Sequence, residues 1–197
     1  MVAQAVRPGW VRWLPNLLSG ARLLAVPVLA VLAYTGREQL FAWILVPALL
    51  TDIADGLVAR LLHLESRLGA MLDTVADTGL LFVALYGVWV FHPEVLAGHA
   101  GLCGAAVALW VVEDVASLLR YRRLSSFHTY TSKVVANLLG LFIGWLFVLG
   151  FEPWLLYAAA GGSILASLEE LVLIALLPRW RADVRGLWWV LRERRGR

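Results

Sequence analysis

The sequence has little cysteine, little charge and no visible internal boundary. Cys103 is its only cysteine, which excludes an internal disulfide and argues against a metal site built from thiolates. Only 16% of the 197 residues are charged, against about a quarter in soluble domains. By contrast, 61% are hydrophobic, and no low-complexity stretch, fixed-period repeat or linker marks a second domain. We therefore expect a single integral membrane domain over residues 1–197.

Six apolar segments predict an all-α membrane protein. Each is close to the ~20 residues that a helix needs to cross the hydrocarbon of a bilayer. The segments run approximately over 15–35, 40–62, 68–92, 100–120, 132–150 and 154–178. They predict a core of six transmembrane helices within residues 15–178.

The segments outside this core favour the membrane surface. Within residues 1–14, Trp10 and Trp13 accompany two arginines, a pattern typical of an interfacial amphipathic helix with its tryptophans at headgroup level. A frayed polar tail is the alternative, because the Pro8-Gly9 pair breaks helices. Residues 179–197 form a basic tail rich in tryptophan and leucine, which we expect to lie on anionic headgroups.

The basic residues predict the orientation, because cytoplasmic loops are enriched in lysine and arginine. Basic side chains precede the first segment, flank the second and fourth connections, and follow the last segment. They are Arg7, Arg12, Arg60, Arg67, Arg120, Arg122, Arg123, Lys133 and the seven arginines of residues 179–197. The other three connections contribute one basic side chain, Arg37, besides two histidines. We expect a multi-pass protein of the inner (cytoplasmic) membrane with both termini in the cytoplasm.

An acidic stretch, DIADGLVARLLHLESRLGAMLDTVAD over residues 52–77, interrupts this apolar background. It contains four aspartates: Asp52, Asp55, Asp73 and Asp77. Helical residues three or four apart share a face, so the aspartates form two pairs, and a polar break near residues 63–67 leaves room for a turn between antiparallel helices. The folded hairpin would bring four carboxylates together at the cytoplasmic side. Such a cluster repels itself in a low-dielectric setting, and carboxylate oxygens suit hard cations such as Mg²⁺ or Mn²⁺.

The spacing of this stretch resembles the signature of the CDP-alcohol phosphotransferase family. All eight fixed positions match: Asp52-x2-Asp55-Gly56-x2-Ala59-Arg60-x8-Gly69-x3-Asp73-x3-Asp77. The resemblance extends to the first apolar segment, where Pro15-Asn16-Leu17 is followed by Ser19, Arg22 and Pro27. It implies a transferase of the EC 2.7.8 type with six membrane helices, and it implies a homodimer.

The resemblance also implies the chemistry. A CDP-linked lipid, CDP-diacylglycerol or an archaeal equivalent, would give its phosphatidyl or archaetidyl group to a small alcohol and release CMP. Two divalent ions, Mg²⁺ or Mn²⁺, would be held by Asp52, Asp55 and Asp73, with Asp77 near the metals and also the base that takes the acceptor's proton. Asp52 would contact the CDP-lipid as well.

Four further positions suit a diphosphate on physical grounds. Gly56 and Ala59 share one helix face and allow a ligand or a neighbouring backbone to come close. Arg60 can form two parallel hydrogen bonds to a pyrophosphate. Gly69 starts the next helix without a side chain that would block the site. These residues complete the expected CDP-lipid site.

The sequence indicates the acceptor site less clearly than the CDP-lipid site. Glu113-x3-Ser117-x2-Arg120 resembles the fourth-helix pattern of the phosphatidylglycerophosphate synthases, which favours glycerol 3-phosphate as the acceptor. The chain departs from that subfamily at Val112, Thr78 and Ser132. We expect Arg120, Arg123 and Lys133 to bind the acceptor's phosphate. The alternative is that these three are ordinary positive residues of a cytoplasmic loop.

Several alternatives stay open from the sequence. Inositol phosphate, phosphatidylglycerol or serine could replace glycerol 3-phosphate, and a homologue without activity could only bind lipid. A different class, an ion or metabolite transporter, could use the aspartates as a relay, although no paired broken helices are visible. No nucleic-acid partner is expected. The polar residues with no assigned role are Arg22, Glu113, Asp114, Glu169 and Glu170; the four acids are possible partners for Arg22.

Overall fold

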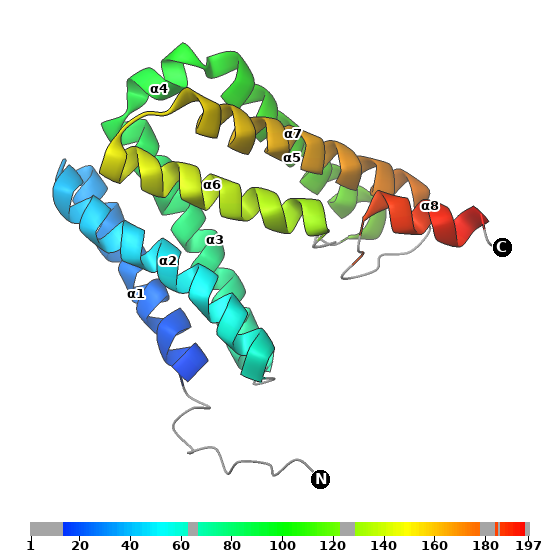
Figure 1. Ribbon diagram of the computed structural model, residues 1–197, viewed down its shortest axis with the longest axis horizontal. Coiled ribbons are helices and arrows are strands. Elements are labelled where there is room, and N and C mark those ends of the chain that lie inside the picture. The colour runs from blue at the N-terminus through cyan, green and yellow to red at the C-terminus, as the bar shows by residue number, and fades with distance from the viewer. Residues whose placement is uncertain (1–13, 63–66, 123–128, 178–183, 185, 196–197) are drawn as a thin grey trace, which may run out of the picture. The chain divides into compact units, whose positions relative to one another are not determined.

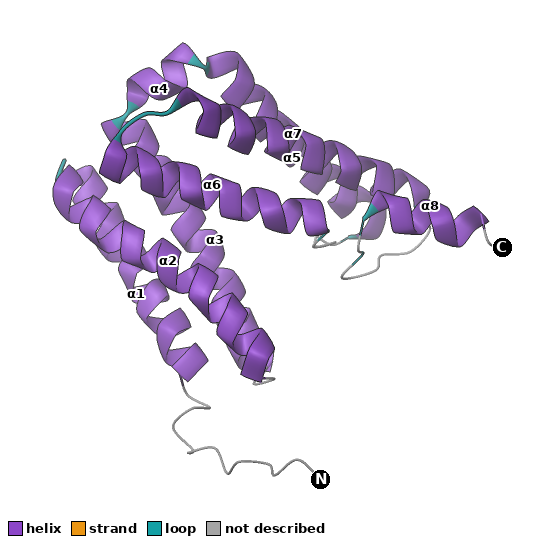
Figure 2. Cartoon of the chain, in the orientation of Figure 1, coloured by secondary structure: helices purple, strands orange, loops and turns teal. Residues whose placement is uncertain are grey.

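The structure, a computed structural model, describes residues 14–62, 67–122, 129–177, 184 and 186–195. These residues form helices joined by short loops, and no strand occurs among them (Figure 2). The helices are α1 (Leu14–Tyr34), α2 (Glu38–Leu62), α3 (Arg67–Phe91), α4 (Pro93–Gly98), α5 (Ala100–Tyr121), α6 (Tyr130–Leu149), α7 (Pro153–Leu176) and α8 (Leu187–Arg195). The all-α class is confirmed for the described part of the chain.

Six long helices coincide with the six predicted apolar segments, within two residues at every end. Among the described residues, three of them, α5, α6 and α7, are long and apolar enough to cross a membrane. Helices α1, α2 and α3 contain shorter apolar stretches, Ser19–Tyr34, Glu38–Thr51 and Val75–Phe91. Six membrane crossings therefore stay a prediction. The interfacial helix predicted within residues 1–14 lies outside the described residues, apart from Leu14, which begins α1.

The helices form two compact units, Met1–Pro93 and Glu94–Arg197. A single domain over the whole chain stays a prediction. In the first unit, α1 packs against both α2 and α3 (Figure 1). Leu29, Phe41, Leu45 and Ala84 are fully buried there. Phe41 lies directly over Gly87 of α3, where a Cβ atom would enter the space of the aromatic ring.

This close approach makes Gly87 a test of the packing in the first unit. Gly87→Ala should destabilise the protein by about 1–3 kcal/mol, because the added methyl group forces the buried Phe41 ring out of its position. The measurement is thermal unfolding in detergent. Gly104→Ala is the matched control, since a Cβ atom there meets open space. Equal unfolding temperatures for the two variants would contradict the packing.

The second unit is built on α7, which packs against α5, α6 and α8. The C-terminal ends of α5 and α7 meet: the Tyr121 hydroxyl lies 3.0 Å from the carbonyl oxygen of Ile174 and 2.8 Å from that of Leu177. These are carbonyls near the end of α7, which lack partners within the helix, so Tyr121 satisfies groups that would otherwise be costly to bury.

Helix α6 begins with a side-chain cap that is joined to α7. The Thr129 hydroxyl accepts a hydrogen bond of 3.1 Å from the backbone N–H of Ser132, an arrangement that stabilises a helix start. The Ser132 hydroxyl in turn donates to the Glu170 carboxylate of α7. Thr129 is completely buried and Glu170 nearly so. The network fixes the first turn of α6 against α7.

Part of the basic tail forms helix α8, which contacts α7. The Glu169 carboxylate accepts a hydrogen bond of 2.8 Å from the backbone N–H of Leu187, the first residue of α8. Val190 is buried in a cluster with Leu173, Ile174 and Leu177. The opposite face exposes Trp188 and Trp189, and the Arg192 guanidinium lies 5.3 Å from the Trp188 ring centre. Such a face suits lipid headgroups, but that placement stays a prediction.

Candidate functional site

The acidic stretch occupies the facing ends of α2 and α3. Asp52 lies ten residues before the last residue of α2, and Asp77 lies ten residues after the first residue of α3, about 15 Å along each helix. Asp55 and Asp73 lie seven and six residues from the same ends, about 10 Å along. The backbone of an antiparallel pair thus places the aspartates at two matching depths.

The remaining signature positions stand on the same two helices. Gly56, Ala59 and Arg60 belong to the last turns of α2, and Gly69 to the first turn of α3. Of the eight signature positions, the structure describes the side-chain surroundings of Asp77. The other seven fall outside this part of the description, so their assigned roles stay predictions.

Asp77 is held by a residue from α1. The Arg22 guanidinium donates through Nη1 to Oδ1 of Asp77, forming an ion pair between α1 and α3. The Arg22 side chain is 1% exposed, whereas that of Asp77 is 40% exposed. The sequence offered four acids of the second half as partners for Arg22; the structure pairs it with Asp77, an acid outside that set.

This pairing joins the first helix to the acidic hairpin. A charge buried away from water needs a partner, and a carboxylate with hydrogen-bond geometry supplies one. Ser19, one turn before Arg22, is also buried. Two polar residues of α1, Ser19 and Arg22, therefore lie inside the first unit.

The donor set fits a hard divalent cation. The four aspartates, whose backbone positions lie at two matching depths along α2 and α3, would supply oxygen ligands of the kind that Mg²⁺ and Mn²⁺ prefer. The paired Arg22 offsets one of the four negative charges, and Asp77 is partly exposed on the hairpin. The side chains of Asp52, Asp55 and Asp73 lie outside the part of the chain whose side chains the structure describes. Among the side chains that it does describe, no group of three or more His, Cys, Asp or Glu residues could hold a metal ion.

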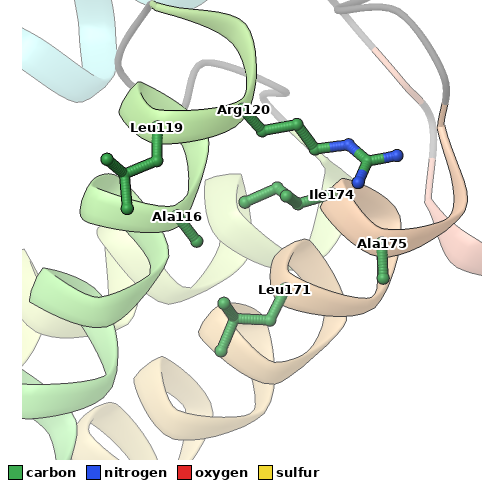
Figure 3. Close-up of a pocket in the computed structure, with 6 residues that line it drawn as sticks. All are labelled: Ala116, Leu119, Arg120, Leu171, Ile174 and Ala175. Carbon is green, nitrogen blue, oxygen red and sulfur yellow. The ribbon is translucent and has the colours of Figure 1, made fainter.

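The predicted acceptor residues occupy the ends of α5 and α6. Arg120 is exposed, and its Nη2 donates a hydrogen bond of 3.3 Å to the Leu177 carbonyl at the end of α7. It borders a shallow, mostly apolar groove of about 570 Å³ between α5 and α7 (Figure 3). The groove is lined by Ala116, Leu119, Arg120, Leu171, Ile174 and Ala175.

The other two residues of that set are less constrained. Lys133 is exposed in the first turn of α6, and its backbone N–H donates to the Thr129 carbonyl at 3.1 Å. Arg123 lies outside the described residues. Binding of an acceptor phosphate by Arg120, Arg123 and Lys133 stays a prediction, and the role of Arg120 at the end of α7 was not predicted.

Sequence reasoning left the roles of several buried polar residues open. Glu113 and Ser117 of α5 and Glu170 of α7 are buried, and Glu169 caps α8. Burying an acidic side chain in an apolar helix costs free energy unless the side chain has a partner, so the sequence indicated that these acids are paired. Which partner each one takes depends on helix packing and could not be read from the local pattern.

Comparison with known proteins finds one family, and relatives that are named either as glycerol-phosphate phosphatidyltransferases or as cardiolipin synthases. The family model described as CDP-alcohol phosphatidyltransferase matches residues 12–165. A "CDP-diacylglycerol--glycerol-3-phosphate 3-phosphatidyltransferase" of Cereibacter sphaeroides is 34% identical over 93 residues, which is 45% of this chain and 38% of that protein. A protein of the same name from Rickettsia typhi is 39% identical over 67 residues, 32% of this chain and 38% of the relative.

A longer alignment is found with a relative that is named as a cardiolipin synthase. A "Putative cardiolipin synthase" of Mycobacterium tuberculosis is 28% identical over 185 residues, covering 84% of this chain and 86% of that protein. The alignments with the two glycerol-phosphate enzymes thus span less than half of each relative. No solved structure matches the chain.

Proposed function

Because the chain belongs to the CDP-alcohol phosphatidyltransferase family, we propose that it is a phospholipid-synthesis enzyme that moves a phosphatidyl group from a CDP-linked lipid to a small alcohol. The observation that carries this proposal is the placement of the complete eight-residue signature on α2 and α3, with its aspartates at matching depths. The family match supports it, because residues 12–165 include both arms of the hairpin.

The proposed reaction forms one bond and breaks one. The acceptor hydroxyl oxygen attacks the β-phosphorus of the CDP-linked lipid, and the bond from that phosphorus to the oxygen of the CMP phosphate breaks. CMP leaves with the electron pair, and the hydroxyl proton passes to the Asp77 carboxylate, which acts as the general base. The product is a phosphodiester that stays in the membrane.

The remaining signature residues bind and orient the lipid. Arg60 pairs with the diphosphate, while Gly56, Ala59 and Gly69 leave room for the nucleotide against the helix backbones. Asp52, Asp55, Asp73 and Asp77 are the residues that would hold two Mg²⁺ or Mn²⁺ ions. When bound, these ions supply charge neutralisation for the diphosphate and for the charge that develops during transfer.

The first choice of acceptor is glycerol 3-phosphate. The names of the Cereibacter and Rickettsia relatives support it. The mycobacterial relative, which covers more of the chain, is named for a different product and favours phosphatidylglycerol as the second choice. Inositol phosphate and serine stay as further acceptors to be tested.

The membrane supplies the lipid and the cytosol supplies the acceptor, so the site belongs at the inner boundary of the cytoplasmic membrane. In this arrangement α1, α2, α3, α5, α6 and α7 cross the bilayer and both termini are cytoplasmic. Helix α8 rests on anionic headgroups through Trp188, Trp189 and Arg192. The working enzyme is proposed to be a homodimer.

The proposal is tested by CMP release. Purified protein in lipid nanodiscs is incubated with CDP-diacylglycerol and Mg²⁺ or Mn²⁺, and each acceptor is added in turn. Release that depends on one acceptor identifies both the class of reaction and the substrate. Absence of CMP release with every acceptor, from protein that retains its helical content, would contradict the proposed function.

Lys133 provides a separate test of the acceptor site. Lys133→Ala should raise the KM for glycerol 3-phosphate about tenfold, because a charge-assisted hydrogen bond to the phosphate is lost, while the KM for the CDP-lipid changes little. Asn137→Ala, an exposed change one turn further along α6, is the control. If Lys133→Ala leaves both KM values unchanged, the predicted basic pocket is placed wrongly.

A further inference from the structure

Arg22 joins the first helix to a signature aspartate of the acidic hairpin. Its Nη1 donates to Oδ1 of Asp77, across the packed surfaces of α1 and α3. The side chain is 1% exposed although arginine is long and strongly polar. Because the Arg22 side chain is buried, the residues packed around it fix its direction and leave the guanidinium little freedom.

The two partners differ in exposure. Asp77 is 40% exposed, so its carboxylate is reachable from outside the helix pair while Arg22 contacts it from within. A carboxylate has two oxygens with about four acceptor sites, so one charged hydrogen bond at Oδ1 does not exhaust its capacity to accept others. The contact from Arg22 thus restricts the direction of the carboxylate without enclosing it.

We propose that Arg22 is a positioning residue for the transfer reaction: its buried guanidinium holds the Asp77 carboxylate in the orientation in which it meets the acceptor hydroxyl. The inference rests on the proposed function of Asp77. A direct contact between Arg22 and a substrate phosphate is disfavoured, because a side chain that is 1% exposed offers no surface to a ligand.

The test compares Arg22→Met and Arg22→Lys with wild type and with Arg37→Met, which removes an exposed arginine between α1 and α2. For each protein, kcat and both KM values are measured by CMP release, and Mn²⁺ affinity by calorimetry. Arg22→Met should lower kcat about 100-fold with KM values nearly unchanged, because small misplacements of a reacting group have effects of this size. Arg22→Lys should recover about tenfold of the loss, since the ammonium restores the charge but not the planar geometry.

Calorimetry supplies a readout that does not depend on turnover. Mn²⁺ affinity should stay the same or increase in Arg22→Met, because a positive charge beside the carboxylates has been removed. Unchanged kcat in both Arg22 variants would overturn the inference and leave Arg22 a structural residue. A raised KM for the CDP-lipid with unchanged kcat would also overturn it, in favour of substrate contact.

The design distinguishes a variant that fails to fold from a wild-type protein that lacks the proposed activity. If Arg22→Met does not fold, Arg22→Lys decides: a kcat lowered about tenfold at constant KM supports positioning, and wild-type kcat overturns it. If wild type itself releases no CMP with any acceptor, the proposed function fails, and the positioning role that rests on it falls with it.

Discussion

Asp77→Asn is expected to lower CMP release by about 10²–10⁴-fold, the range that a general base contributes. The amide has nearly the same shape as the carboxylate but cannot take the proton of the acceptor hydroxyl. Losing the counter-charge of the buried Arg22 guanidinium should lower the stability of the protein. The amide oxygen can still accept the hydrogen bond from Arg22, so the side chain should keep its place between α1 and α3 in the folded protein. The KM for the CDP-lipid should therefore change little.

The measurement is single-turnover CMP release together with binding of the CDP-lipid. Asp114→Asn is the matched control, because Asp114 is also an acid within an apolar helix, α5, and is not one of the eight signature positions. Turnover by Asp77→Asn at the rate of wild type would remove the assigned role of Asp77. Loss of lipid binding along with turnover would assign Asp77 to binding in place of proton transfer.

Asp73→Asn is expected to raise the Mn²⁺ concentration needed for half-maximal activity by about 100-fold or more, since even indirect partners of a metal change affinity by about 10–100-fold. Asp73 lies one helical turn before Asp77 on α3, and at nearly the depth of Asp55 on α2. A neutral amide there removes a negative charge and an anionic ligand from the cation site.

The result for Asp73 separates metal binding from proton transfer. At saturating Mn²⁺, Asp73→Asn should regain part of its activity, whereas Asp77→Asn should not. A normal Mn²⁺ dependence in Asp73→Asn would contradict the assignment of Asp73 as a ligand. Asp114→Asn serves again as the control and should match wild type.

The long helices were predictable from the sequence because each is a continuous apolar run. The helix ends fall within two residues of the expected segments, including the narrow interval between α2 and α3. The arrangement of the signature on two facing helices was predictable for the same reason, since fixed spacing along regular helices determines depth. Membrane crossing is supported by length and composition for α5, α6 and α7, whereas in α2 and α3 the acidic stretch follows or precedes the apolar part.

The partners of buried polar residues were not predictable. Arg22 lies in the first helix and Asp77 in the third, and only the packing of α1 on α3 brings them together. Glu169 and Glu170 are neighbours in the sequence but serve different elements, α8 and α6. Such pairings depend on how helices rotate against one another, which a local pattern does not contain.

Helix α8 was missed for a different reason. It is nine residues long, and arginines and tryptophans dominate its sequence, so the pattern indicated a surface tail without indicating a helix. Its position depends on the Glu169 cap and on burial of Val190 beside α7. Both are tertiary contacts, and isolated helices of this length are marginal in water.

The most direct test of the account is Mn²⁺ binding to the wild-type protein, measured by calorimetry in nanodiscs without any substrate. The four aspartates of α2 and α3 are predicted to take up two ions per chain, and Asp73→Asn should weaken that uptake. A wild-type protein that retains its helical content and takes up no Mn²⁺ or Mg²⁺ would contradict the account.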